Sequence, residues 1–548
     1  MPTNPHSPRA QAQPQPQGFL TPHQALVQPI APGTTIKPLL STGDVLPNGY
    51  QMAGRPDGLG AYDNGDGTFT LYMNHELARP DNLSDARVSK LRLDKRTAAV
   101  VDGKYIVDGS EGYKHFCSGT MLGPREGFDR PYFLTGEENT TGKYGGVAAV
   151  IDSRNERVTS LVYAGRLKWE NLIAVPGWPG KSVFLGFDDI VPGGIYMYVG
   201  STPEDMWTGR ADMYVFAADG GARNENAVSK GRPISGRFVK IDKQKASTSR
   251  DGTIAESEKA GYFWFSRPED GTYDLNDPTA FYFNVTGWPE YIDNGSGKPY
   301  NAKGRLYRVQ LDVADPTRVT ELRVLLDGDA GDDILSPDNI AASPTHLMLQ
   351  EDIIEHYEGL RPARVVAYEI ATGKTTPVAE VTHRDFAGRA IDDDKLGLWE
   401  SSGIINASDV LGEDMWLLDV QPHGYNVPQF GGSDTAGQLL AMKAPGTAPV
   451  QVATSGTPTT NPAPGHRRRS RRNAKTPRRQ DAKDAQRLRI VAQERGPVYD
   501  ITYTGPLWYS TNLILLGVVL GVSASWRLAP IPFTAPRLFA PALRPVGG

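Results

Sequence analysis

Short apolar runs that end in acidic residues recur along this chain, and they constrain its fold more than any other feature. Five such runs cover residues 68–76, 132–138, 182–189, 262–270 and 346–352. They follow one another roughly every 50 to 80 residues, a spacing typical of repeated β units such as propeller blades. Further runs rich in β-branched and aromatic residues lie between them, at residues 147–151, 194–199, 305–311 and 364–370. The pattern predicts an all-β fold made of many short strands.

Repeated strands of this kind predict one large β-propeller. In a propeller, equivalent strands of the blades run along a central channel, so that their ends meet at one mouth. We therefore expect the acid-ended runs to be innermost strands with their carboxylates gathered at the channel. Taken singly, each acid is explained equally well as an ordinary strand-to-turn residue. Five clusters at one mouth would repel one another unless cations held them, so the pattern predicts a metal site at the central channel.

Charge is distributed unevenly along the chain. The 548 residues carry a formal charge of −5. Residues 466–548 hold 15 Lys and Arg against 4 Asp and Glu, about +11, which leaves about −16 for the first 465 residues. An acidic body repels nucleic acid and suits hard cations, whose ligands are oxygen atoms.

Composition divides the chain into four parts. Residues 1–18 are rich in Pro and Gln and are expected to be disordered, whereas residues 19–445 form the propeller body. A Pro- and Thr-rich linker covers residues 446–465, and a basic low-complexity tail covers residues 466–548. The tail's apolar segment, residues 513–522, is short for a bilayer span, which needs about 20 residues. Its composition favours solvated disorder over membrane contact.

Cys117 is the single cysteine of the chain, so neither an intrachain disulfide nor a thiolate zinc cage can form. It precedes the paired acids Glu137 and Glu138, which are candidate metal ligands. Taken alone, one cysteine is equally well explained as a small buried apolar residue. A thiolate beside carboxylates would favour a softer ion such as iron over calcium alone.

Arg267 and Glu269 are candidate catalytic residues because they stand two positions apart in one motif. A guanidinium suits bidentate capture of phosphate, and the neighbouring carboxylate could hold a metal that polarises the phosphate. A surface ion pair is the alternative interpretation. Further candidate metal ligands at strand ends are Glu76, Glu170, Asp338, Glu351 and Asp352.

These motifs, in this order, resemble the PhoX-type alkaline phosphatases and their broader family of β-propeller proteins. The likeness extends over about residues 19–443, and the matching segments are Asn74-His-Glu76, Cys117-Ser-Gly119, Glu137-Glu-Asn139, Gly165-Arg-Leu-Lys-Trp-Glu170, Arg267-Pro-Glu269 and Ser336-Pro-Asp-Asn339. Each segment is short, and their shared order carries the resemblance. The chain departs from the family's pattern in a longer segment after Cys117, and in Gly136, which stands where the phosphatases often have a second cysteine.

The resemblance implies a six-bladed propeller whose calcium and iron ions hydrolyse phosphate monoesters. By the same resemblance Cys117 would be an iron ligand and Arg267 would hold the phosphate. The implied carboxylate ligands are Glu138, Glu170, Glu269 and Asp338. The expected partner is a small phosphorylated substrate, the expected state is a monomer, and the implied location is periplasmic or extracellular. Residues 1–18, however, contain no apolar segment of the kind that a signal peptide needs.

Two other functions fit the same residues. A non-catalytic propeller stabilised by calcium would need the carboxylates and neither iron nor turnover. A phytase-like or lactonase-like propeller hydrolase would use calcium in the channel without needing the cysteine. The chain has no glycine-rich phosphate loop followed by Lys and no Gly-x-Ser-x-Gly motif, which disfavours nucleotide-triphosphate enzymes and serine hydrolases.

Overall fold

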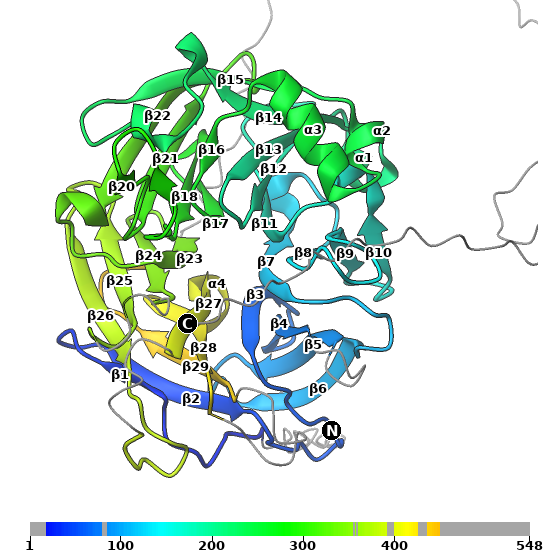
Figure 1. Cartoon of the computed structure of the whole chain (residues 1–548). Coiled ribbons are helices and arrows are strands. Elements are labelled where there is room, and N and C mark those ends of the chain that lie inside the picture. The colour runs from blue at the N-terminus through cyan, green and yellow to red at the C-terminus, as the bar shows by residue number, and fades with distance from the viewer. Residues whose placement is uncertain are drawn as a thin grey trace, which may run out of the picture. The chain divides into compact units, whose positions relative to one another are not determined.

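The computed structural model describes residues 18–78, 85–353, 357, 360–391, 399–425 and 436–449. This part of the chain consists mainly of β-strands, grouped in antiparallel sheets that stand around a common centre (Figure 1). The predicted β-rich architecture is therefore confirmed. Among the described residues no helix has the length and apolar character to cross a membrane. The predicted N-terminal segment up to residue 17, most of the linker and the whole basic tail lie outside the described residues.

Two sheets contain four consecutive strands each. The first consists of β3 (Pro56–Asp63), β4 (Thr68–Ala78), β5 (Asp85–Asp94) and β6 (Val100–Val107). The second consists of β7 (Phe116–Leu122), β8 (Tyr132–Glu137), β9 (Ala148–Asp152) and β10 (Val158–Leu161). The 3-10 turn η1 (Pro124–Glu126) follows β7, and another, η2 (Val162–Ala164), follows β10.

The largest sheet contains two runs of consecutive strands that pair through their outer edges. One run is β11 (Trp169–Ala174), β12 (Ser182–Asp188), β13 (Gly193–Gly200), β14 (Asp212–Ala218) and β15 (Ile234–Lys240). The other is β17 (Pro268–Asp274), β18 (Asp277–Val285), β21 (Arg305–Leu311) and β22 (Arg318–Asp327), and β15 pairs with β22. The short strand β16 (Trp264–Phe265) pairs with β13, and β19 (Ile292–Asp293) and β20 (Lys298–Pro299) form a separate hairpin.

Helices are few in this region and lie between the strands of the largest sheet. They are α1 (Asp205–Thr208), α2 (Lys243–Ala246) and α3 (Arg250–Ala260), with the 3-10 turns η3 (Asp219–Gly221), η4 (Glu225–Ala227) and, after β22, η5 (Gly328–Ala330). Figure 1 shows the three helices on one side of the body, outside β13 and β14.

Strands from the two ends of the described chain complete the last two sheets. β23 (Pro337–Ala342), β24 (His346–Glu351), β25 (Arg364–Glu369) and β26 (Thr375–Val381) are joined by β1 (Val27–Pro29). β27 (Trp399–Asn406), β28 (Met415–Pro422) and β29 (Gln438–Lys443) are joined by β2 (Thr35–Ser41), and α4 (Ser408–Leu411) connects β27 to β28. Because β2 pairs with β29, the N-terminal and C-terminal strands close the body on itself.

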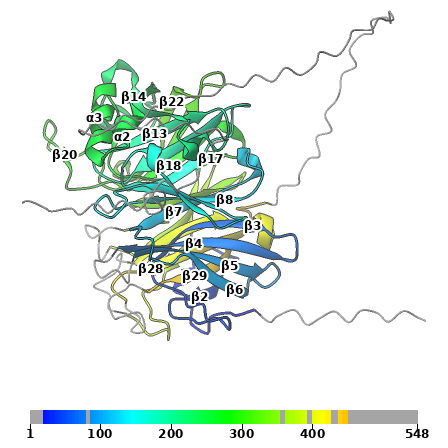
Figure 2. The same ribbon diagram turned by 90° about the vertical axis from the view of Figure 1, so that its right-hand side faces the viewer.

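The first strands of the successive units surround the centre of the body. Each contacts the next in the order β3, β7, β11, β17, β23 and β27, and β27 contacts β3 again. These strands form a closed ring, which we call the inner strands. Figure 2 shows β3 and β7 crossing the middle of the body with the remaining strands of their sheets beside them. A closed ring of inner strands with sheets extending outward is a propeller-like arrangement.

Apolar side chains fill the spaces between neighbouring sheets rather than one central core. One cluster, for example, joins β8 and β9 to β11 and β13 around Trp169, and another joins β25 to β28 around Trp399 and Trp416. Sheets packed on both faces need strands that are apolar on both sides, so the strands read as short continuous apolar runs. At about 25 cal/mol per Å² of buried apolar surface, these layers supply most of the favourable free energy of folding.

The structure corrects the expected position of the acid-ended runs. Four of the five are the second strands β4, β8, β12 and β24, and not the innermost strands. Residues 262–270 are not one strand, because β16 ends at Phe265 and β17 begins at Pro268. Each second strand runs antiparallel to its inner strand, so its C-terminal end still lies beside the beginning of the inner strand.

The C-terminal edge of the described body extends a few residues past 445. Thr447 and Ala448 are buried, and Trp416 Nε1 donates to Thr447 Oγ1 at 2.9 Å. The first residues of the predicted linker are therefore packed against the last sheet.

Candidate metal centre

The six inner strands begin with the same arrangement. The second residue of each strand carries a side chain that can ligate a metal, and we call this set the inner ring: Asp57, Cys117, Glu170, Glu269, Asp338 and Glu400. All six residues are buried. Equivalent strands of a closed ring place equivalent positions at the same height, so one turn of the ring collects five carboxyl groups and one thiol.

A second set comes from the ends of the neighbouring strands. The first residue of each inner strand pairs with a residue of the second strand, such as His75 opposite Pro56 and Glu137 opposite Phe116. The residue after that partner points to the channel mouth, and we call this set the outer ring: Glu76, Glu138, Asp189, Thr286, Asp352 and His423. The two rings together form the site.

The local backbone conformation determines the direction of the inner-ring side chains. The pairing shifts register just after the inner-ring residue, between Pro56 and Leu59 in β3 and likewise near the beginning of β7, β11, β17 and β23. Such bulges redirect a side chain and are common beside functional sites. The residue before the strand has a positive φ in four cases: Arg55 (47°), His115 (57°), Arg267 (65°) and Ser336 (47°). Non-glycine residues adopt this conformation rarely, so the surrounding structure holds it in place.

Possible ligand atoms lie close together around the rings. Atoms within 4.8 Å of one another occur in the groups Asp57–Glu76–Cys117, Glu76–His115–Glu138, Cys117–Glu138–Glu170 and Glu170–Glu269–Asp338. Because these groups share members, they form one continuous cluster. A further group, Asp352–Glu400–His423, lies in the last two sheets.

Two basic residues bind the cluster on one side. Arg267 donates from Nε and Nη2 to the two carboxylate oxygens of Asp189, at 2.9 and 3.0 Å, and Nη2 lies 3.1 Å from Glu269 Oε1. Lys168 Nζ donates to Glu138 Oε1 at 2.7 Å and lies 3.8 Å from Asp189 Oδ2.

Basic and acidic side chains also alternate on the other side of Glu138, from His115 to Glu76 and Arg55. His115 places Nδ1 3.2 Å from Glu138 Oε2 and Nε2 3.1 Å from Glu76 Oε1. Arg55 Nη2 lies 3.5 Å from Glu76 Oε2. Arg55, His115, Lys168 and Arg267 each immediately precede an inner strand, so an arc of four basic side chains, the basic arc, borders half of the mouth.

Burial changes the acidity of the inner ring. It raises the pKa of Glu170, Glu269 and Asp338 well above the ordinary range. Neighbouring carboxylates raise the pKa of Glu170 and Asp338 further, whereas the charge of Arg267 offsets part of the effect of burial at Glu269. Burial also raises the pKa of the Cys117 thiol, which donates from Sγ to Asp57 Oδ2 at 3.3 Å. Without a counter-charge, these groups therefore favour their protonated forms.

Two acids with a basic partner, Glu138 of the outer ring and Glu400 of the inner ring, differ from their unpaired neighbours. Burial opposes ionisation of Glu138, but the charge of Lys168 and the hydrogen bond from His115 hold the pKa of that carboxyl well below its ordinary value. His423 has the corresponding effect on Glu400, which lies 2.9 Å from His423 Nε2. Burial and the charge of Glu400 raise the pKa of Asp352 to about 7.

The possible ligand atoms suit a hard cation bound by carboxylate oxygens, with a neighbouring site for a softer ion beside the Cys117 sulfur. Within the described part of the chain, Glu269 Oε2 and Asp338 Oδ1 are buried without a hydrogen-bond partner, and both belong to the group that includes Glu170. A buried carboxylate oxygen without a donor is costly unless a proton or a cation binds it. Calcium prefers such oxygen atoms, whereas the Cys117 sulfur suits iron.

Seven of the nine candidate ligands come together at this centre, with Arg267 beside them. They are Glu76, Cys117, Glu138, Glu170, Glu269, Asp338 and Asp352. Glu137 and Glu351 lie elsewhere, because successive residues of a strand point to opposite sides. Glu137 accepts hydrogen bonds from the backbone N–H groups of residues 114, 146 and 147, and Glu351 is paired with Arg361 and Arg364.

Other residues of the site were missed at the sequence level. They are Asp57, Glu400, Arg55, His115, Lys168 and His423, whereas Asp189 ends the predicted acid-ended run 182–189 without having been singled out as a ligand. One signal could have found Asp57. Arg55-Pro-Asp57, Arg267-Pro-Glu269 and Ser336-Pro-Asp338 share a proline and then an acid, and each begins an inner strand.

Asn and Gln side chains of the second strands support the bulges of the next sheet. Asn74 Nδ2 donates to the carbonyl of Cys117 at 2.6 Å, and Asn284 Nδ2 donates to that of Asp338 at 2.9 Å. Gln421 Nε2 donates to Glu76 Oε2 at 2.8 Å. The two asparagines satisfy backbone carbonyls at the bulges, whereas Gln421 fixes an outer-ring carboxylate.

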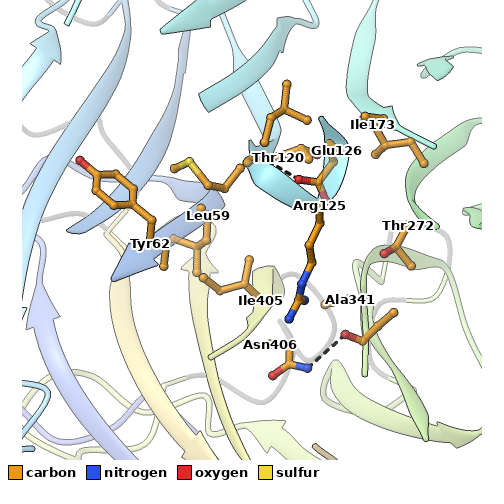
Figure 3. A pocket seen from close by; sticks show the side chains of 18 of the residues that line it. Leu59, Tyr62, Thr120, Arg125, Glu126, Ile173, Thr272, Ala341, Ile405 and Asn406 are labelled. Carbon is orange, nitrogen blue, oxygen red and sulfur yellow. Dashed lines mark hydrogen bonds between the residues drawn. The ribbon is translucent and has the colours of Figure 1, made fainter. Parts of the chain in front are cut away.

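A separate pocket of about 430 Å³ lies at the opposite mouth of the channel. It is lined by later residues of all six inner strands, among them Leu59, Thr120, Ile173 and Ile405. Figure 3 shows the Arg125 side chain extending across it toward Asn406. Asn171, which also lines the pocket, donates to Asp270 and accepts from Thr120.

No family model and no curated protein match this sequence. Solved structures do match, and they belong to the class of mainly β, propeller-like proteins. One is Pseudomonas fluorescens PhoX in complex with vanadate, a transition state analogue, with a TM-score of 0.55 and 14% identity over 79% of this chain and 98% of that chain. Another is Penicillium chrysogenum α-L-arabinanase complexed with arabinobiose, with a TM-score of 0.38 and 8% identity over 74% and 98% of the two chains. The resemblance to PhoX alkaline phosphatase that the motifs predict is thus confirmed at the level of the fold.

Proposed function

We propose that this chain is a six-bladed propeller phosphatase that hydrolyses phosphate monoesters at a metal cluster in its channel mouth. The observation that carries the proposal is the inner ring, in which six equivalent strands each contribute a metal-ligating side chain. Six inner strands in a closed ring support six blades. The likeness of the fold to PhoX supports the choice of reaction.

The residues that would hold the ions follow from the donor atoms. Glu170, Glu269 and Asp338 offer carboxylate oxygens for calcium, and Cys117 with Asp57 offers a thiolate and a carboxylate for iron. When bound, such ions supply positive charge for the phosphoryl oxygens and acidify an oxygen nucleophile. Outer-ring carboxylates would complete the coordination.

The chain's own residues would bind and orient the phosphate. Arg267 presents a guanidinium at the mouth, already fixed by Asp189, and a guanidinium matches two phosphoryl oxygens at once. Lys168 adds a second positive charge next to it. A fixed pair of cations stabilises charge that develops on the phosphoryl group without having to reorganise during the reaction.

We also propose that the substrate is a small molecule, that the body acts as a monomer, and that it works in the periplasm or outside the cell. Nucleic acid is not an expected partner of the body, because the first 465 residues carry a formal charge of about −16.

Elemental analysis and p-nitrophenyl phosphate turnover test the proposal together. We expect calcium and iron in the purified protein, turnover by wild type, and loss of turnover in Glu269→Gln. Calcium without iron, together with no turnover, would instead support a non-catalytic propeller stabilised by calcium. Turnover with calcium alone, unaffected by Cys117→Ser, would support a phytase-like or lactonase-like site.

A further inference from the structure

The basic arc extends farther than one phosphate group requires. Arg55 precedes β3 and Arg267 precedes β17, and these strands are three positions apart in a closed ring of six. The two arginines therefore border the mouth from opposite sides. A phosphate held by Arg267 leaves Arg55 facing another part of the same molecule.

The two arginine side chains also differ in the number and length of their hydrogen bonds and ion pairs. Arg267 makes a bidentate pair with Asp189 and reaches Glu269 as well. Among the described residues, the Arg55 side chain donates one hydrogen bond, from Nε to Gln421 Oε1 at 3.2 Å, and its ion pair with Glu76 is longer, at 3.5 Å. A guanidinium carries five N–H donors, so Arg55 keeps donors for a ligand. Its side chain is 26% exposed at the mouth.

From this geometry we infer that the preferred substrates carry a second anionic group, which Arg55 binds while the scissile phosphate lies at the metal centre beside Arg267. This inference rests on the proposed phosphatase function and specifies its substrate class. His115, between Glu76 and Glu138, links Arg55 to the rest of the arc. The second group is a phosphate or a carboxylate, because both present two oxygens to a guanidinium.

A matched pair of sugar phosphates tests the inference. We expect kcat/KM for fructose 1,6-bisphosphate to exceed that for fructose 6-phosphate by about tenfold, the effect of one charge-assisted hydrogen bond. Arg55→Gln should reduce this ratio to about two, the statistical factor for two scissile groups, whatever it does to turnover itself. Arg125→Gln, at the opposite mouth, is the control and should leave the ratio as in wild type. Comparing 6-phosphogluconate with glucose 6-phosphate tells whether a carboxylate can replace the second phosphate.

The outcomes separate this inference from the proposed function. Turnover of both fructose phosphates with a ratio of about two in wild type would overturn the inference and leave the phosphatase intact. A ratio that survives Arg55→Gln would also overturn it, because the preference would then arise elsewhere. Absence of turnover with every substrate, including p-nitrophenyl phosphate, would overturn the function and the inference with it.

Discussion

The Arg267 guanidinium holds Asp189 in a bidentate ion pair, with donor–acceptor distances of 2.9 and 3.0 Å, although Arg267 itself has a positive φ of 65°. An uncommon backbone conformation therefore coincides with a fully oriented side chain. Such strain persists when several contacts fix the residue, and it is common at functional sites. The pair connects the beginning of β17 to the end of β12, so it ties two neighbouring inner-strand units together at the mouth.

Arg267→Lys should reduce kcat/KM for p-nitrophenyl phosphate by about 100-fold, because an ammonium cannot bind Asp189 and phosphate through a planar fork. The variant keeps the positive charge, so the loss would report on geometry. Initial rates under metal saturation measure it. Arg125→Lys, in the other pocket, controls for general effects of the substitution. Wild-type activity in Arg267→Lys would show that Arg267 does not orient the phosphate.

The outer ring could largely be predicted from the sequence. Acids such as Glu138 and Asp352 follow short apolar runs, and an apolar strand followed by a carboxylate is visible in a linear pattern. What the pattern could not decide is which of two adjacent acids faces the channel. That choice depends on the strand's register, and a shift of one residue exchanges the two faces.

Four inner-ring residues were already candidates because they lie in the motifs that resemble the PhoX family: Cys117, Glu170, Glu269 and Asp338. Asp57 and Glu400 were harder to predict because they stand at the beginning of a strand and not at its end. Asp57 follows Arg55-Pro56 and precedes Gly58, a combination that favours a turn on sequence alone. Glu400 follows only the short segment Leu396-Gly-Leu-Trp399, which comes directly after three aspartates and a lysine. The bulges that aim these side chains arise from contacts between sheets far apart in sequence, such as the hydrogen bond from Asn74 to the carbonyl of Cys117. Local patterns carry no information on such contacts.

Adjacent glutamates give a sharp test of this register. Glu138→Gln should lower metal content and activity, because its carboxylate joins both Cys117 and Glu170 in one group of possible ligands. Glu137→Gln should keep metal and activity but lower the free energy of unfolding by about 1–3 kcal/mol, because it disturbs buried hydrogen bonds from three backbone N–H groups. Elemental analysis and urea denaturation separate the effects. Equal metal loss in both variants would contradict the assignment.

Metal-free protein should become less stable as the pH rises. The pKa of Glu170, Glu269 and Asp338 is raised in the folded state by burial, so folding favours their protonated forms. The stability they contribute is complete below their ordinary pKa, about 4, and is lost as the pH rises through the folded-state values. For Asp352 that loss begins at about pH 4 and is complete at about pH 7, its folded-state pKa.

Thermal unfolding in EDTA between pH 5 and pH 8 measures this loss. We expect Tm to fall across the interval in EDTA, and to fall less with saturating calcium, because a bound cation favours the ionised carboxylates. Glu269→Gln should flatten the profile in EDTA by removing one titrating group. A Tm that rises with pH equally in EDTA and in calcium would show that these acids do not govern stability.

Cys117→Ser should lower iron content and leave calcium bound. A hydroxyl oxygen is a poor replacement for a thiolate at iron, whereas the carboxylates that suit calcium are unchanged. In metal-free wild type, burial raises the pKa of the thiol, so it should react with a thiol reagent only when the protein unfolds. Iron retained at the wild-type level in Cys117→Ser would exclude the sulfur as a ligand.

The close approach of Trp169 to the backbone at Gly136 leaves no room for a cysteine side chain before the paired glutamates of this chain. A Cβ at Gly136 would lie 2.3 Å from the Cβ of Trp169 and 2.8 Å from its backbone oxygen. Trp169 is fully buried and immediately precedes Glu170 of the inner ring, so it cannot move aside without displacing the site. Gly136→Ala should therefore lower the free energy of unfolding by about 1–3 kcal/mol and reduce metal content.

Gly295→Ala is the matched control, because a Cβ at Gly295 would meet no atom closer than 3.5 Å. This variant should change the free energy of unfolding by less than about 0.5 kcal/mol. If urea denaturation showed equal stability for both variants, the close approach of β8 to Trp169 would not be what requires glycine at this position.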